Sequence, residues 1–322
     1  MSNVARHITV LKDDDGQRLD RWLKKQGFSF SAAQKIVRTG QVRIDGKRAK
    51  ADQKLVEGQD VRLPPSELPK QKVKKYTQAD REFLQNLIIY EDKDIIALNK
   101  PAGLATQGGS GIKKHIDGML PSLAGKDGVT PRLVHRLDRE TSGVLLIAKS
   151  AETARSLGKI FQGRNIQKIY WALCAPSPEI LSGEIRGGLR RGDGPDKEKM
   201  VIDEENGQAA QTFFEVIEQA GNKVAFIAFW PRTGRTHQIR VHAAASGFAV
   251  LGDEKYAPPE QAEGLDIAPG LHLHAREVSF KHPVSRKMIV IQAPLPPEKA
   301  KSWKNLGFNP KNKEPVFEDI PL

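Results

Sequence analysis

A polar turn between two apolar runs is the stretch of this chain best suited to chemistry. Leu133-Val134 precede it and the run Val144 to Ala148 follows it. Apolar strands that lead into and out of a charged turn place that turn at a sheet edge or cleft, on a rigid support. Within the turn, Arg136 and Arg139 flank Asp138, and a nearby cation favours the ionised form of a carboxylate. Such a carboxylate can act as a nucleophile or a general base.

The residues of this turn alone leave other interpretations open. A salt-bridged surface loop gathers charges in the same way. A glycoside hydrolase could use Asp138 and Glu140, since residues two apart on a strand share a face. That chemistry needs carboxylates that flank a sugar, roughly 5–9 Å apart. It also needs aromatic side chains to stack on the sugar, and Phe, Trp and Tyr make up only 6% of the chain.

The elements around the turn can be predicted from periodicity. The runs Leu87–Tyr90 and Ile95–Leu98, joined by four charged residues, predict a hairpin. Ile166–Ala175 is expected to be a strand. Farther along, Thr236 can cap a helix that runs to Ser246. On that helix two side chains of interest, His237 and Arg240, are three positions apart and share a face.

Charge is distributed unevenly along the 322 residues. The net charge is +12, and residues 1–75 hold 18 Lys and Arg against 9 Asp and Glu, whereas the other 247 hold 33 against 30. A basic N-terminal module predicts binding to a polyanion. Cys174 is the only cysteine and the first residues lack an apolar signal segment. We therefore expect no disulfide within the chain, no Cys-based zinc site and a cytoplasmic location.

The chain is expected to contain two domains joined by a linker. Residues 1–65 predict two short helices (Gln17–Lys25 and Ala32–Thr39) followed by short strands, and residues 66–84 look like a basic Pro/Lys linker, with a helix over Gln78–Asn86 at its end. Residues 85–297 are expected to form the larger domain. Residues 298–322 are expected to be a weakly held tail that Trp303, Leu306 and Phe308 could dock.

Three motifs give the chain a resemblance to a known family. H-R-L-D-R-E-T-S-G at 135–143 resembles the H-R-L-D-x-x-T-S-G signature of the RluA-type pseudouridine synthases. K-x-Y at 168–170 and T-G-R-T-H-Q-I-R at 233–240 match the second and third motifs of that family. The opening Y-E-D-x-D-I-I-A-L-N-K-P-A-G-L and the stretch 251–256 continue the pattern. Q-G-G-S-G at 107–111 is similar to the RluC branch, as is the N-terminal region, whose G-x-V-x-I-D-G-K resembles an S4 RNA-binding domain.

The resemblance implies a role for each motif residue. Asp138 would be the essential catalytic residue, and Arg136 would contact the RNA where the target base is flipped out. Tyr170 would stack on that base and is a candidate for proton transfer. Ile239 would pack on the opposite face of the base, and Arg240 would pair with Asp138. Further RNA contacts are expected in the larger domain at His135, Arg235, His237, Gln238 and Lys100, and in the S4-like domain, to phosphates, at Arg21, Lys24, Lys35, Arg38 and Arg43.

The resemblance also implies a fold and an activity. The fold would be α+β, with a mixed, largely antiparallel central sheet and flanking helices, preceded by the small S4-like α/β domain. The activity would be isomerisation of uridine to pseudouridine in RNA, most simply 23S-type ribosomal RNA, without a cofactor, by a monomer. Two alternatives stay open: a transfer-RNA substrate, and a non-catalytic S4-type ribosome-assembly factor.

A metal site is not favoured by the sequence. His237, His242, His272 and His274 could in principle supply ligands. No cysteine is near them, and no carboxylate stands at the spacing of a zinc protease motif.

Overall fold

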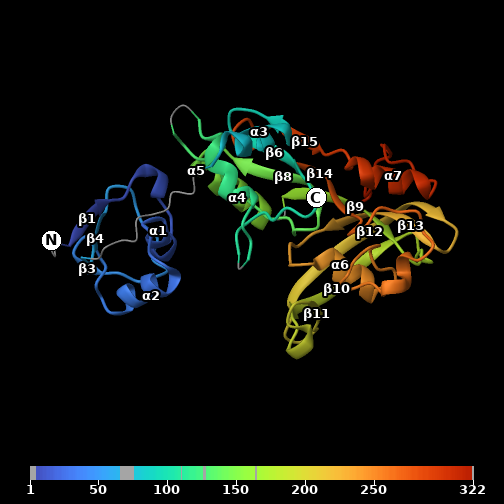
Figure 1. Ribbon diagram of the computed structural model, residues 1–322, viewed down its shortest axis with the longest axis horizontal. Coiled ribbons are helices and arrows are strands. Elements are labelled where there is room, and N and C mark those ends of the chain that lie inside the picture. The colour runs from blue at the N-terminus through green and yellow to red at the C-terminus, as the bar shows by residue number, and fades with distance from the viewer. Residues whose placement is uncertain (1–4, 66–75, 110, 126–127, 164, 321–322) are drawn as a thin grey trace. The chain divides into compact units, whose positions relative to one another are not determined.

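The computed structural model describes residues 5–65, 76–109, 111–125, 128–163 and 165–320. The chain divides into two compact units, Met1–Lys75 and Tyr76–Leu322 (Figure 1). Of the predicted linker, residues 66–75 lie outside the described part. Its last residues are helical, because Thr77 caps the helix α3 (Gln78–Asn86) through a capping box with Asp80.

The N-terminal unit packs two helices against a small antiparallel sheet of order β1-β4-β2-β3. Its elements are β1 (Arg6–Thr9), η1 (Lys12–Asp14), α1 (Leu19–Lys25), α2 (Phe30–Arg38), β2 (Arg43–Ile44), β3 (Lys47–Arg48) and β4 (Asp60–Leu63). Ser29 begins α2, since its side chain accepts a hydrogen bond from the Ala32 amide. The two helices match the predicted ones to within two residues at each end.

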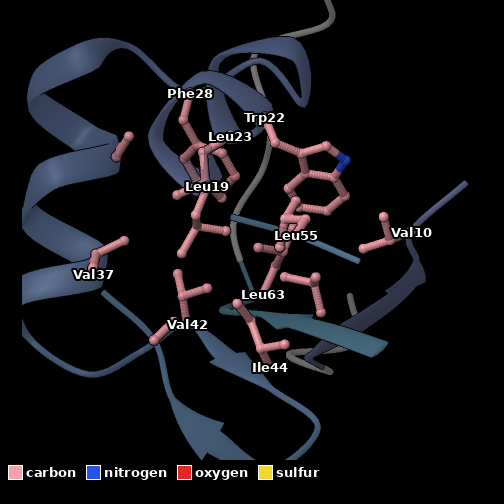
Figure 2. Close-up of a cluster of buried hydrophobic side chains, with 13 residues drawn as sticks. Val10, Leu19, Trp22, Leu23, Phe28, Val37, Val42, Ile44, Leu55 and Leu63 are labelled. Carbon is pink, nitrogen blue, oxygen red and sulfur yellow. The ribbon is translucent and has the colours of Figure 1, made fainter. Parts of the chain in front are cut away.

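One apolar cluster holds this unit together. Trp22 has no exposed surface and lies among leucine and valine side chains from both helices and the sheet, as Figure 2 shows. The indole Nε1–H donates to the buried carboxylate of Asp14, which also binds the Lys25 ammonium. Apolar spacing of three and four on α1 therefore turns one face of the helix inward and leaves its cations outside.

The larger unit is built on a sheet of eleven strands. These are β5 (Ile88–Glu91), β6 (Ile95–Lys100), β7 (Arg132–Leu133), β8 (Ser142–Ala148), β9 (Ile166–Cys174), β10 (Ser182–Arg191), β11 (Met200–Ile202), β12 (Gln208–Ala220), β13 (Val224–Pro231), β14 (Leu273–Lys281) and β15 (Met288–Gln292). The helices after α3 are α4 (Ile116–Met119), α5 (Ala151–Gln162), α6 (Gln238–Ala245) and α7 (Pro297–Asn305), with 3-10 turns η2 (Leu120–Leu123), η3 (Gly194–Asp196) and η4 (Pro259–Ala262).

The strand order is β11-β10-β12-β13-β9-β14-β8-β6-β5, with β15 on β14 and β7 on β8. Every pairing is antiparallel except that of β14 with β8, which are parallel over two residue pairs, His274 with Ser142 and Ala275 with Gly143. The predicted fold class, a mixed and largely antiparallel sheet with flanking helices, is confirmed.

The central strands are buried on both faces, which explains their unbroken apolar sequences. On β13, one face packs towards α7 and includes Phe226 and Trp230. The other face packs towards α6 and includes Ile227 and Phe229. Every residue of β13 is buried. The ends of β13 and α6 are thus held rigidly next to the segment 231–237.

The C-terminal residues are packed through Trp303, Leu306 and Phe308, the side chains named as able to dock them, so this segment is not weakly held. Trp303 of α7 has no exposed surface, and Phe308 and Phe317 join the same cluster against β9 and β13. Three aromatic side chains buried in one cluster outweigh the polar character of the segment between them. None of the helices in the described part is long and apolar enough to cross a bilayer.

Candidate active site

The loop from His135 to Thr141 leads from β7 into β8 and carries Asp138. The Asp138 side chain is 31% exposed. Where the loop joins β8, Gly143 has φ +111°, and a Cβ there would lie 2.2 Å from the Ala275 carbonyl oxygen. Only glycine permits this approach of β8 to β14. Ala275 also pairs with Tyr170 on β9, so the close approach places the Asp138 loop one strand away from Tyr170.

Two side chains from the segment 100–106 hold the backbone of this loop. The buried Thr106 hydroxyl donates to the Leu137 carbonyl at 2.6 Å and accepts from the Leu137 amide at 3.2 Å. The Lys100 ammonium donates to the Arg139 carbonyl at 3.0 Å. The residues on both sides of Asp138 are therefore fixed, while its carboxylate stays open to the cleft.

Lys100 itself has no exposed surface, so the predicted RNA contact at this residue is wrong. Its ammonium also donates to the carbonyls of Pro101 and Leu104, both at 2.8 Å. Burial lowers the pKa of Lys100 to about 7, against the Glu140 and Asp138 carboxylates, which raise it. The three carbonyls favour the charged form, because a neutral amine has only two protons to donate.

Asp138 lies at a narrow cavity of about 100 Å³ that could receive a flat ring. Tyr170, Ile239, Leu273 and Arg136 are among its lining residues. The volume is small beside the roughly 300–1,000 Å³ of pockets for drug-sized ligands. Burial, helped by the Asp138 charge, raises the pKa of Tyr170 above its ordinary value. Its hydroxyl is therefore protonated at neutral pH.

Arg240 is paired with Asp253 and not, as predicted, with Asp138. Its Nε donates to the Asp253 carboxylate at 2.6 Å, Nη2 binds the other carboxylate oxygen, and both side chains are buried. Burial lowers the pKa of Arg240, but Asp253 and, more weakly, Asp138 raise it above its ordinary value overall. Arg240 still lines the cavity and acts on Asp138 through its charge.

The His237 ring lies beside the Asp138 carboxylate, with Nε2 3.9 Å from Oδ2. Its backbone is left-handed, φ +53°, a strained conformation outside glycine. Nδ1 lies 2.7 Å from the Tyr256 hydroxyl, which accepts from the Met200 amide. In the tautomer in which the Tyr256 hydroxyl donates its proton to Nδ1, the Nε2–H of the neutral ring faces Asp138. Burial lowers the pKa of His237, against the Asp138 charge that raises it.

Comparison with known proteins gives a consistent result. The RNA pseudouridylate synthase family profile matches residues 94–245, and the S4 domain profile matches residues 17–61. Ribosomal large subunit pseudouridine synthase C of Pasteurella multocida is 34% identical over 313 residues, 94% of each chain. The protein of the same name from Yersinia pestis is 36% identical over 91% of this chain and 92% of its own. This chain belongs to the RNA pseudouridine synthase family.

Solved structures agree with this membership. Human RNA pseudouridylate synthase domain containing 4 superposes with a TM-score of 0.59 and 27% identity, over 70% of this chain and 95% of that one. Human RNA pseudouridylate synthase domain containing 1 gives 0.54 and 28%, over 65% and 83%. The enzyme class predicted from the motifs is thereby confirmed, as are RNA as the substrate class and the presence of an S4 domain.

Some motif residues of this pseudouridine synthase line the cleft but use their polar atoms within the protein. Gln238 is buried, and its amide binds the Gln211 carbonyl and the Thr212 hydroxyl at 2.9 Å each. Its carbonyl accepts from Thr233 and from the Arg235 amide. With all four bonds made inside the protein, Gln238 joins β12 to the segment 233–235. The structure thus gives it a different role from the RNA contact predicted for it.

His135 is likewise held from within. Its Nε2 accepts from the Leu146 amide at 2.8 Å, and its ring stacks on Phe161 with centroids 4.4 Å apart. Burial lowers the pKa of His135 to about 3, so the ring is neutral. Its Nε2 is a structural acceptor and not a cationic RNA contact. Arg136 and Arg235, in contrast, are exposed at the cleft, where an RNA contact is open to them.

The cations predicted to meet phosphates in the S4 domain all lie on its surface. They are Arg21, Lys24, Lys35, Arg38 and Arg43. They come from α1, α2 and β2, the elements whose inward faces form the apolar core.

A cluster outside the cleft was not foreseen from the sequence. Asp92, Asp94 and His282 have ligand atoms within 4.8 Å of one another. However, His282 Nδ1 accepts from the amides of Val284 and Ser285, which puts the proton of the neutral ring on Nε2, 3.2 Å from the Asp92 carboxylate. A metal would need a lone pair on Nε2. These residues fit a contact between imidazole and carboxylate better than a metal site.

Three functional residues were missed by the sequence reasoning: Thr106, Asp253 and Tyr256. The last two lie in the stretch 251–256, which continues the family pattern, so a signal for them existed. Thr106 stands alone between Ala105 and Gln107, and no pattern marks it.

Proposed function

We propose that this synthase isomerises specific uridines of large-subunit ribosomal RNA to pseudouridine, with Asp138 as its catalytic carboxylate. The observation that carries the proposal is the placement of Asp138 at a ring-sized cavity beside Tyr170 and Ile239. The relatives named for the large subunit support the choice of RNA. We also propose that the protein works as a monomer in the cytoplasm, because the RNA supplies the large partner surface.

The target uridine has to leave its stack to reach Asp138, which costs a few kcal/mol. Arg136 is exposed at the cavity entrance and would occupy the space that the base vacates. Tyr170 and Ile239 would hold the two faces of the uracil ring. Base–aromatic stacking contributes about 1–3 kcal/mol, enough to offset much of the cost of flipping.

The reaction breaks the N1–C1′ bond, turns the uracil and joins C5 to C1′. In one route Asp138 attacks C1′ as uracil leaves through N1, and C5 later displaces the carboxylate. In the other route Asp138 takes a proton from the ribose as uracil leaves through N1, and the proton returns to the ribose as C5 bonds to C1′. In both, the C5 proton is lost and N1 gains one, so atoms balance without a redox or energy source.

The surroundings of Asp138 suit either route. Arg240 and the His237 ring both lie near the carboxylate, and the Asp138 charge raises the pKa of each. Neither forms a close ion pair with it, so its oxygens stay available to the ribose. Tyr170, protonated at neutral pH, can donate a hydrogen bond but does not compete as a base.

The test is pseudouridine mapping on total RNA from cells that lack this gene and from cells complemented with variants. Asp138→Asn should remove the marks that wild type restores and should lower turnover at least 10²–10⁴-fold, the usual contribution of a catalytic acid or base. RNA binding should persist, since the exposed cations are untouched.

Glu140→Gln is the matched control. This carboxylate lies two residues away and is exposed, with Arg139 3.0 Å from it. The Glu140→Gln variant should restore every pseudouridine that wild type restores. Restoration by Asp138→Asn would instead identify the protein as a non-catalytic RNA-binding factor. Loss of marks from transfer RNA alone would refute the ribosomal substrate.

A further inference from the structure

A second, larger cavity adjoins the one that holds the reacting base. Its volume is about 560 Å³, and it shares Asp138, Tyr170 and the cations Arg136, Lys168 and Arg235 with the smaller cavity. It extends from them towards α5, where Gly158, Phe161 and Gln162 line it. A volume in the range of roughly 300–1,000 Å³ is large enough for a nucleotide-sized ligand. The single flipped base does not account for it.

The charge of this second cavity is strongly one-sided. Four cationic side chains line it, against the single carboxylate of Asp138: Arg136, Lys168, Arg232 and Arg235. Two of them are aimed by protein contacts. Lys168 donates to the Thr233 carbonyl at 3.2 Å, and the Arg232 guanidinium lies over the Trp230 ring at 4.7 Å.

Another cavity that Asp138 lines differs in charge. Its volume is about 530 Å³, and four carboxylates line it against three cations, Arg139, Arg240 and Lys255. Both arginines are paired with acids of the same lining, Glu140 and Asp253. Carboxylates are therefore in excess there, whereas cations are in excess in the cavity towards α5, so a phosphodiester is favoured in the latter.

The α5 wall has an independent sign of an occupant. Gly158 stands in the middle of α5, where glycine costs about 1 kcal/mol relative to alanine. No atom in the described part of the chain explains it, since a Cβ built there meets none within 4 Å. Glycine in a helix interior that faces an open cavity permits close approach of a ligand to the backbone. Phe161, three residues on, supplies an apolar surface beside it.

We propose that this second cavity binds the nucleotide next to the target uridine. Its phosphodiester would lie against Lys168, Arg232 and Arg235, and its base would lie over Gly158 and Phe161. The inference rests on the proposed function, because it assumes an RNA strand with its target base beside Asp138. It adds that the strand leaves the reacting base on the α5 side, so the neighbouring nucleotide contributes to substrate selection.

Substitutions at Gly158 that fill the cavity test whether this glycine serves RNA binding or only the structure of the helix. Gly158→Ala should raise the melting temperature by about 2–4 °C through helix propensity, and yet raise KM several-fold. Gly158→Glu should raise KM at least tenfold. Ser156→Ala and Ser156→Glu are the matched controls on the same helix, and their KM should equal that of wild type. Tritium release from in vitro transcribed 23S ribosomal RNA labelled at uridine C5 gives KM and kcat.

The phosphate contact has its own test, on a stem–loop RNA that carries the mapped uridine. Replacing one of the two phosphodiesters that flank this uridine by an uncharged methylphosphonate should raise KM for wild type. The same replacement should have little further effect in Arg232→Ala, because contacting groups are non-additive.

The outcomes are distinguishable. If wild type releases no tritium, the proposed function fails. If wild type is active but both Gly158 variants keep the KM of wild type, or if the phosphonate and Arg232→Ala effects simply add, the neighbouring-nucleotide site is refuted while the function stands.

Discussion

The two units of this synthase use cationic side chains in opposite ways. In the S4 domain the predicted phosphate contacts, such as Lys24 and Arg38, stand exposed around an apolar core. In the catalytic unit Lys100 and Arg240 are buried and bound to named partners. Exposed charges attract any phosphate with little demand on geometry. Buried charges instead fix the conformation of the backbone and loops around them. The cavity that results accepts a single base.

Lowering the pH should give the largest difference in stability between the two units. Burial lowers the pKa of His242 and His274 to about 4 and that of His272 to about 3. Unfolding exposes these rings at an ordinary pKa near 6.5, so the unfolded state binds more protons between pH 6.5 and 4. Stability of the catalytic unit therefore falls as pH decreases through this window, by about 1.4 kcal/mol per pH unit for each histidine.

The N-terminal unit has a single histidine, His7, whose side chain is 58% exposed, so its unfolding releases no buried imidazole. Hydrogen exchange followed by mass spectrometry between pH 6.5 and 5 resolves the units. Equal loss of protection in both would contradict the role of the buried histidines.

Removing one partner of the buried ion pair tests the comparison next. Asp253→Asn leaves Arg240 charged and buried, which should cost the catalytic unit about 3–5 kcal/mol. Urea denaturation measures the loss. Glu254→Gln, the exposed neighbour, should change stability by no more than about 0.5 kcal/mol. A similar small change for Asp253→Asn would mean that Arg240 is solvated in solution.

A neutral anchor should have a smaller effect on stability but a visible one on catalysis. Thr106→Val removes both hydrogen bonds to Leu137 and leaves two backbone groups unpaired, at about 1–3 kcal/mol. Because the loop then positions Asp138 poorly, kcat should fall while KM stays near that of wild type. Thr106→Ser keeps the hydroxyl and should restore kcat in the tritium-release assay. A change confined to KM would remove Thr106 from the positioning of Asp138.

The smallest effect is expected where cations are exposed. Replacing Lys24, Lys35 and Arg38 by alanine should leave kcat unchanged. The log–log dependence of RNA affinity on salt should become shallower by about 0.7–0.9 per residue that contacts a phosphate. Filter binding at several salt concentrations measures the slope. The same substitution at the exposed Lys281 and Lys287 of the catalytic unit should leave it unchanged. An unaltered slope in the first variant would argue against phosphate contacts by the S4 domain.

The sequence predicted the fold and the cleft well where signals are local. The hairpin of β5 and β6, the helix α3 and the strand that carries Tyr170 follow from apolar spacing and turn residues. The position of Asp138 between two apolar runs is equally local. These features need no knowledge of distant parts of the chain.

Partners across the fold were beyond that reasoning. Asp138 and Asp253 are both carboxylates, and only the folded chain brings Asp253 within hydrogen-bond distance of Arg240. Lys100 looks like any other lysine at the end of a strand, yet three carbonyls gather around it. The helix α6 was expected to have Thr236 as its cap. It begins at Gln238 after a left-handed His237, because the contacts of that ring override local capping.

The strand order has a consequence for how the active site is assembled during folding. β14 lies between β8 and β9 in the sheet, although it is among the last strands to leave the ribosome. The Asp138 loop borders it on one side and Tyr170 on the other. A nascent chain that already displays all three motifs therefore still has two separate half-sites. The two halves of the site are joined through the sheet only when β14 pairs with both β8 and β9.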